Sequence, residues 1–229
     1  MSGIPVIAVD GPSASGKGTV AQRVAEVLGF HYLDSGALYR LTALAAERQG
    51  ATWHDEQAVA DIAAKLDVVF DGAAILLAKS DVTEAIRTEN IGIGASIVAA
   101  LPLVRAALLE RQRAFALVPG LVADGRDMGS TVFPHAPLKV FLTASAEARA
   151  ERRYKQLTER GEAADLAAIT ADLHARDERD RQRSVAPLQQ LPDALLLDTT
   201  EMGIAEAVQQ VLAWWHTATE VQRKSVPSA

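Results

Sequence analysis

The chain has 229 residues, of which 49% are hydrophobic and 23% charged, and its formal net charge is -6. This length and composition are typical of one sizeable α/β domain with small insertions, and they exclude a mostly disordered chain. The acidic balance argues against general nucleic-acid binding, and the absence of cysteine excludes disulfides, thiolate metal sites and cysteine nucleophiles.

The first expected element is the β-branched apolar run at residues 4–9, which predicts a strand buried on both faces of a parallel sheet. A turn rich in glycine and serine follows this strand. Apolar residues then recur at helical spacing over residues 17–28, and Gly29 ends the pattern. The N-terminal segment therefore reads as strand, glycine turn and helix.

Residues 34–100 break the alternation of strand and helix, so we interpret them as an inserted lobe. Helices are expected at 34–50 and 55–66, the first of them capped at Asp34 or Ser35. Two apolar runs flanking the pair Asp71-Gly72 then predict a hairpin. A further helix follows, with Pro102 in its first turn.

The second half of the chain returns to alternating strands and helices. Strands are expected at 121–123, in "PLKVFLTAS" and in "DALLLDTT", and helices at 145–161, 165–183 and 204–215. This alternation predicts an α/β fold with a parallel, doubly wound sheet and helices on both faces. The last residues, around "EVQRKSVPSA", have the small and polar composition of a tail.

Between the first strand and the first helix lies "GPSASGK", with the spacing G-x-x-x-x-G-K of a phosphate-binding loop. Glycines let the backbone N–H groups point inward, while the helix N-terminus and a lysine add positive charge. The alternative is a tight glycine turn with an exposed lysine. The pattern favours a nucleoside triphosphate site formed by Gly11, Pro12, Ser13, Ala14, Ser15, Gly16, Lys17, Gly18 and Thr19.

The loop departs from the usual pattern at Gly18, where a serine or threonine normally coordinates magnesium. The hydroxyl stands instead at Thr19, and "GKGT" is the form seen in nucleoside monophosphate kinases. Three further motifs follow: "LDSGALYR" at 33–40, "ADGRDMGSTVFP" at 123–134 and "RDERDRQRSVAPL" at 176–188. With these four motifs in order, nearly the whole chain resembles the bacterial cytidylate kinases, which phosphorylate CMP and dCMP with ATP.

The resemblance implies a five-stranded parallel sheet, a nucleotide-binding insertion with a small hairpin, and a short helical lid. On this basis we expect a core of residues 1–33, 101–148 and 184–218, with the insertion at 34–100. The lid and its following helix would cover 149–183, and the tail 219–229. The resemblance also implies a monomer.

The same resemblance implies which residues bind the acceptor nucleotide. Ser35, Arg40 and Arg126 would hold it, Arg176 and Asp180 would bind the ribose hydroxyls, and Ser96, Arg105, Asp127 and Arg183 would read the base. The alternatives are a helix cap for Ser35, a plain helix serine for Ser96, and solvated surface charges for the arginines. The spacing of Arg176 and Asp180 lets one helix face present both.

Cytosine presents an amine that donates, with a ring nitrogen and a carbonyl that accept. By the resemblance, Asp127 and Ser96 face the amine and the arginines face the acceptor edge. Uracil would turn a carbonyl toward Asp127, leaving a buried carboxylate opposite an acceptor. This contrast predicts a preference for CMP over UMP.

Transfer of a phosphoryl group needs positive charge around the moving group, and the acceptor phosphate is already an anionic nucleophile, so no general base is expected. We assign Lys17, Arg40 and Arg126 to this charge. Lid arginines, Arg152 and Arg153 with Arg160 as a further candidate, would close over the transfer site. Magnesium accompanies the triphosphate, and Thr19 and Asp124 are its expected contacts, directly or through water.

Other functions are less well supported by the sequence. Adenylate and shikimate kinases share the phosphate loop but not the hairpin insertion together with Asp127 and its arginines. A regulatory GTPase would need an N-K-x-D motif, which the sequence lacks. A protein that only binds ATP is the third alternative. With no signal peptide and no apolar run approaching about 18 residues, we expect a cytoplasmic protein with no membrane or nucleic-acid partner.

Overall fold

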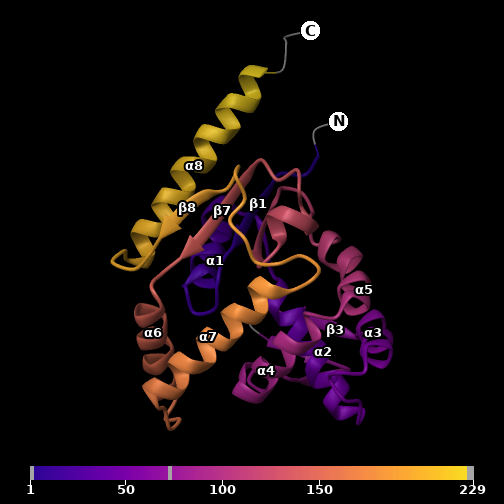
Figure 1. Ribbon diagram of the computed structural model, residues 1–229. Helices are drawn as coiled ribbons and strands as arrows, with labels where there is room; N and C mark the ends of the chain where they lie inside the picture. Colours follow the sequence, from indigo (N-terminus) through magenta and orange to yellow (C-terminus); the bar gives the residue numbers. More distant parts are fainter. Residues whose placement is uncertain (1–2, 72–73, 226–229) are drawn as a thin grey trace. The chain divides into compact units, whose positions relative to one another are not determined.

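The computed structural model describes residues 3–71 and 74–225, and Figure 1 shows the course of the chain. The chain divides into two compact units. Unit 1 comprises Met1–Leu33 and Phe115–Ala229, and unit 2 comprises Asp34–Ala114.

Unit 1 is built on a five-stranded sheet with the strand order β2-β6-β1-β7-β8. The central strand β1 pairs in parallel with β6 and β7, and β7 pairs in parallel with β8. The predicted fold class is therefore confirmed. The strands are β1 (Val6–Asp10), β2 (His31–Asp34), β6 (Leu121–Gly125), β7 (Leu138–Thr143) and β8 (Leu195–Asp198).

The register of the sheet brings the carboxyl ends of its central strands to one edge. Asp10, the last residue of β1, lies opposite Gly125, the last residue of β6, and opposite Phe141 of β7. Ligands of doubly wound sheets gather at this edge. The polar residues that follow β1 and β6 are thus placed beside one another.

The helices of unit 1 flank this sheet. Helices α1 and α8 pack against each other and, with β1 and β7, bury one apolar core. Val24 of α1 and Val211 of α8 are completely buried there, as is Val9 of β1. Helices α6 and α7 pack on each other. The bounds are α1 (Lys17–Leu28), η2 (Met128–Val132), α6 (Ala146–Glu159), α7 (Leu166–Gln182) and α8 (Ile204–Ser225).

The helix ends agree largely with the sequence signals. Gly29 follows α1 with a left-handed φ of 65°, and the side chain of Ser145 accepts the backbone N–H of Ala148 at the start of α6. Helix α8 was expected to end near residue 215 but continues to residue 225. No glycine or proline interrupts the sequence between those positions, so nothing stops the helix. The expected tail is thus helical to residue 225, and residues 226–229 lie outside the described range.

The residue after β1 is a glycine because the neighbouring strand approaches it closely. A Cβ on Gly11 would lie 1.9 Å from the backbone carbonyl oxygen of Leu142 in β7. Backbone atoms cannot move aside as the end of a long side chain can. The first glycine of the loop is therefore required for packing between β1 and β7.

This close approach makes Gly11→Ala a test of the loop's anchoring. We expect the substitution to lower the free energy of unfolding by about 1–3 kcal/mol, because the added methyl forces the two strands apart. Urea unfolding would measure the loss. Gly203→Ala is the matched control, since a Cβ there meets no atom within 4 Å. Equal stability of the two variants would contradict the packing argument.

Unit 2 consists of helices and a small antiparallel sheet of order β3-β4-β5. Helix α2 packs on α3 and α4, and α3 packs on α5. The predicted hairpin is confirmed in its strands, while Gly72 of its turn lies outside the described residues. The elements are α2 (Ser35–Arg48), α3 (Glu56–Ala64), β3 (Val68–Asp71), β4 (Ala74–Leu77), β5 (Ser80–Asp81), η1 (Ala85–Arg87), α4 (Glu89–Val98) and α5 (Pro102–Arg113).

Helix α5 was expected to belong with the core but lies in unit 2, where it packs on α3. Helix α4 and strand β5 had no counterpart among the expected elements. Within residues 3–71 and 74–225, no single helix is long and apolar enough to cross a membrane. Helices α4 and α5 meet that criterion only as a pair, with a bend of 100° between them.

Candidate functional site

The phosphate loop joins β1 to α1 with the backbone geometry of an anion-binding turn. Ala14 and Gly16 have positive φ angles of 57° and 89°, and Gly16 is the residue that precedes the helix. The hydroxyl of Ser15 donates to the carbonyl of Pro12 at 3.0 Å, which closes the turn from within. Alternating backbone conformations of this kind turn successive N–H groups toward one point. The loop can therefore receive a phosphate at the N-terminus of α1.

At the start of α1, Lys17 forms an ion pair with Asp124. Their side-chain nitrogen and carboxylate oxygen lie 3.6 Å apart, and both side chains are nearly buried. The hydroxyl of Tyr32 donates to the same carboxylate at 3.4 Å. Asp124 thus places one negative charge directly beside the loop, at the end of β6.

The position of Asp124 explains the unusual glycine that follows the lysine. A Cβ on Gly18 would lie 3.1 Å from a carboxylate oxygen of Asp124 and 3.5 Å from the hydroxyl of Tyr32. A serine or threonine at position 18 would have to displace one of these groups. The hydroxyl group is found one residue later, on the exposed Thr19.

The donor set beside the loop suits a magnesium ion that is bound mainly through a substrate. Mg²⁺ prefers oxygen ligands and keeps most of its waters, so one or two protein contacts are sufficient. Asp124 offers a carboxylate and Thr19 a hydroxyl. Among the residues the structure describes, no group of three or more histidine or acidic side chains is arranged to hold a metal by itself. Such a site therefore fits Mg²⁺ carried on a triphosphate.

A buried network of charges joins the phosphate loop to helix α7. Arg126, just past the end of β6, donates through Nε to Asp180 at 2.7 Å and through Nη2 to the Ser13 hydroxyl at 2.7 Å. Arg183 also donates to Asp180. Three of the residues expected to bind the acceptor, Arg126, Asp180 and Arg183, are thus brought together.

The charge state of Asp180 follows from these neighbours. Burial alone would raise its pKa, but the guanidinium groups of Arg126, Arg183 and Arg176 lower the pKa below its ordinary value. The carboxylate is therefore ionised at neutral pH. The three arginines and Asp180 together carry a net positive charge. This charge suits binding of an anion or of hydroxyl groups nearby.

Asp127 lies between Arg126 and the short π-helix η2. The residue is buried, and its backbone carbonyl accepts from the N–H groups of Thr131 and Val132 at 2.9 and 3.2 Å. The next two backbone N–H groups, of Met128 and Gly129, donate to the two carboxylate oxygens of Asp10, each at 2.8 Å.

Asp10 itself lies in an unfavourable electrostatic environment. Burial and, to a smaller extent, the nearby carboxylates of Asp127 and Asp124 raise the pKa of its carboxyl to about 7, although the two backbone hydrogen bonds lower it. A carboxyl group with a strongly shifted pKa at the carboxyl edge of such a sheet marks a candidate functional position. The sequence analysis did not identify Asp10.

Helix α6 contributes two arginines to the phosphate loop. Arg152 donates to the carbonyl of Ser15 at 3.2 Å and to the hydroxyl and carbonyl of Thr199, which follows β8. Arg149, which the sequence analysis did not identify, donates to the carbonyl of Ser13 at 3.2 Å and forms a buried ion pair of 2.7 Å with Asp177. The loop backbone is thereby held by two guanidinium groups.

The other two lid arginines are not placed at the loop by the described contacts. Arg153 is half-buried on α6, and Arg160 ends that helix as an exposed residue. Arg149 is buried one turn before Arg152, and its guanidinium donates directly to a carbonyl of the loop. Arg149 is therefore a stronger candidate for contact with the loop than Arg153 or Arg160. The helical spacing of three residues between Arg149 and Arg152 was the available signal.

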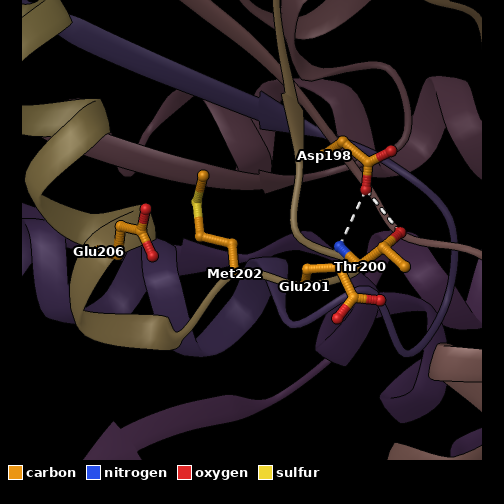
Figure 2. A pocket seen from close by; sticks show the side chains of 5 residues that line it. All are labelled: Asp198, Thr200, Glu201, Met202 and Glu206. Carbon is orange, nitrogen blue, oxygen red and sulfur yellow. Dashed lines mark hydrogen bonds between the residues drawn. The ribbon is translucent and has the colours of Figure 1, made fainter.

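A pocket of about 320 Å³ opens beside the turn after β8 and is shown in Figure 2. In that turn, Asp198 accepts from the backbone N–H and the hydroxyl of Thr200 at 2.8 and 2.6 Å. The residues that line the pocket are Asp198, Thr200, Glu201, Met202 and Glu206. Three carboxylates repel phosphate groups, so this pocket does not compete with the phosphate loop for the triphosphate.

Unit 2 holds the remaining expected residues, on α2, α4 and α5. Arg40 donates to the carbonyl of Ile86 at 2.8 Å, and a Cβ on Gly92 would lie 3.4 Å from its guanidinium. Arg105 is buried, donates to the carbonyl of Ala99 at 3.2 Å and lies 5.8 Å from the centre of the Tyr39 ring. Neither arginine is a solvated surface charge.

The two serines of unit 2 are also buried. Ser35 opens α2, but the cap is the side chain of Asp34, which accepts from the Ala37 N–H at 3.1 Å. Ser96 lies on α4. Capping therefore does not account for Ser35, and both serines are buried.

A family model and several relatives of this chain indicate the same family. A family model described as cytidylate kinase matches residues 7–217. The cytidylate kinase of Chromobacterium violaceum is 63% identical over 212 residues, covering 93% of this chain and 96% of the relative. That of Neisseria meningitidis is 61% identical over 210 residues, covering 92% and 96%. A gluconokinase structure from Sinorhizobium meliloti is 18% identical, with a TM-score of 0.52 and coverage of 97% and 98%, and shows the fold alone.

Proposed function

The chain belongs to the cytidylate kinase family and is therefore a phosphotransferase that phosphorylates CMP or dCMP with ATP, and we propose here which residues carry out each part of that reaction. The proposal assigns the phosphate loop to ATP and the residues named from the four motifs to the acceptor. The observation that supports it most strongly is the Arg126, Asp180 and Ser13 network, which links acceptor residues to the loop.

The donor phosphates bind to the N–H groups of residues 11–19 and to the ammonium group of Lys17. Lys17 lies 3.6 Å from Asp124. A triphosphate offers the lysine a stronger negative charge than one carboxylate. Lys17 can therefore turn from Asp124 toward the β- and γ-phosphates when ATP binds.

The transferred phosphoryl group is stabilised by positive charge from Lys17, Arg40, Arg126, Arg152 and Arg153. No residue is needed to remove a proton, because the acceptor phosphate is an anion. The contact of Arg152 with the Ser15 carbonyl supports its assignment, since it keeps that guanidinium beside the loop. Arg153 is assigned by its position on α6 alone, and Arg160, which follows α6, is a further candidate.

The acceptor nucleotide is assigned to the residues that the sequence motifs indicate. Ser35, Arg40, Ser96 and Arg105 belong to unit 2, and their burial supports a role beyond the surface. In unit 1, Asp127 accepts the cytosine amine, Arg176 and Asp180 bind the ribose hydroxyls, and Arg126 and Arg183 supply positive charge. The ionised state of Asp180 supports its role as a hydroxyl acceptor.

Magnesium would be held by Asp124 and Thr19, directly or through water, together with the triphosphate. When bound, the ion neutralises charge on the β- and γ-phosphates. We further propose that residues 34–100 form the nucleotide-binding insertion and 149–183 the lid region. The protein would act as a cytoplasmic monomer in pyrimidine nucleotide metabolism.

An acceptor screen tests the proposed function. With ATP and Mg²⁺, we expect CMP and dCMP to give rapid ADP release, while AMP, GMP and shikimate give little. A coupled assay of ADP measures this for each acceptor separately. ATP alone provides the control, because a protein that only binds ATP would show no stimulation by CMP. AMP or shikimate as the best acceptor would favour the alternative small-molecule kinases.

A further inference from the structure

The two backbone N–H groups that follow Asp127 are held by a single carboxylate from another strand. Asp10 ends β1, and its two oxygens accept from Met128 and Gly129, each at 2.8 Å. Asp10 is 7% exposed, so water does not compete for these bonds. A buried N–H group that loses its acceptor in such a place is left unsatisfied.

The other side of Asp127 is fixed as well. Arg126 is bonded to Asp180, to Ser13 and to the carbonyl of Gly125. The carbonyl of Asp127 itself accepts from η2. The backbone of Asp127 is therefore fixed on both sides, and the side chain of Asp10 accepts the N–H groups of the two residues that follow Asp127.

Discrimination between cytosine and uracil depends on such restraint. A carboxylate rejects an opposed carbonyl only if it cannot rotate or shift away, because a mobile loop would move until the repulsion is relieved. A displacement of about 1 Å is enough to weaken a designed contact strongly. Because Asp10 holds two of its N–H groups, the segment from Asp127 to Gly129 cannot move away from the base.

We propose that Asp10 is a positioning residue that determines base specificity by fixing the backbone beside Asp127. The inference rests on the proposed function, in which Asp127 reads the cytosine amine. Asp10 does not touch the nucleotide. It acts through the N–H groups of Met128 and Gly129.

Asp10→Asn tests the proposal because the amide keeps the size of the side chain but has one acceptor oxygen. One of the two N–H groups then faces an NH₂ group, and the segment beside Asp127 loosens. We expect the ratio of kcat/KM for CMP over UMP to fall about tenfold, with a raised KM for CMP. The KM for ATP should be unchanged, although Asp10 directly precedes Gly11.

Asp193→Asn is the matched control. Asp193 accepts from Lys139 at 2.7 Å in the same unit, but its side chain is largely exposed. This variant should keep the wild-type ratio. An unchanged ratio in folded Asp10→Asn, or an equal rise in KM for ATP and CMP, would overturn the inference, since Asp10 would then support only the fold or the phosphate loop.

Hydrogen exchange on the wild-type protein decides the matter if Asp10→Asn fails to fold. The amides of Met128 and Gly129 should be protected about as strongly as those of β1, whereas exchange at the rate of an exposed loop would overturn the inference. The proposed function and the role of Asp10 can be contradicted separately. A wild-type protein that does not phosphorylate CMP contradicts the proposed function, while normal CMP activity with an unaltered Asp10→Asn ratio contradicts only the role of Asp10.

Discussion

Replacing Lys17 by methionine is expected to lower kcat/KM for ATP by about 10²–10³-fold, the loss found when one electrostatic donor to a transition state is removed. The methionine keeps most of the buried length of the side chain but removes its charge. The substitution also leaves Asp124 without the ammonium group 3.6 Å away, so the local charge turns against an incoming triphosphate. Steady-state assays with CMP held at saturation measure this loss.

Lys155→Met provides the control for the charge change. Lys155 lies on α6, is largely exposed and is 3.9 Å from Glu159. Its exposed pair contributes little, so activity should stay at the wild-type level. If Lys17→Met retained full activity while both variants were folded, the assignment of the ATP phosphates to this loop would be wrong.

Asp127→Asn is expected to narrow the preference for CMP over UMP by about 10²-fold or more, because a site built to bond one polar edge rejects its opposite strongly. The new amide can turn either its oxygen toward the cytosine amine or its NH₂ toward the uracil carbonyl. The residue is buried, so water cannot replace the missing partner. Measuring kcat/KM for both acceptors gives the ratio directly.

Asp172→Asn is a suitable companion variant, since Asp172 is exposed on α7. It removes the same charge from the same unit without changing a buried position. A loss of CMP preference in both variants would show that overall charge, and not Asp127, sets the ratio. A retained preference in Asp127→Asn would remove this residue from base recognition.

The regular elements of unit 1 were predictable because their signals are local. The apolar run before the loop, Gly29 after α1 and Ser145 before α6 each act within a few residues of the chain. The parallel sheet followed from alternation of these elements. Helix α8 extends further than expected, because the polar composition of residues 219–225 suggested a tail although no residue there breaks a helix.

The phosphate loop could also be located from sequence, but its glycine at position 18 could not be explained. Its cause is Asp124, far away along the chain, whose carboxylate oxygen would lie only 3.1 Å from a Cβ at that position. Asp10 was overlooked for a related reason. It acts through hydrogen bonds to backbone groups distant in sequence, and such contacts leave no spacing pattern. For Arg149, the helical spacing from Arg152 was the available signal.

The residues of unit 2 show the limit of local interpretation in another way. A serine at the start of a helix suggests a cap, but Asp34 performs that function and Ser35 is buried. Arginines on helices suggest solvated charges, but Arg40 and Arg105 bond to backbone carbonyls inside the unit. Only packing distinguishes these alternatives, and packing depends on helix α4, which the sequence analysis did not anticipate.

The most direct test of the account is a competition among acceptors in one reaction. Equal concentrations of CMP, UMP, AMP and GMP are mixed with ATP, Mg²⁺ and the wild-type protein. The CDP, UDP and GDP formed early are separated and counted, and AMP is followed by its consumption, because ADP is also formed from ATP in every turnover. Their ratios equal the ratios of kcat/KM. The account predicts that CDP predominates, with UDP a minor product and GDP near the background. A mixture in which UDP equals CDP, or in which AMP is consumed first, would contradict the role given to Asp127 and the arginines around it.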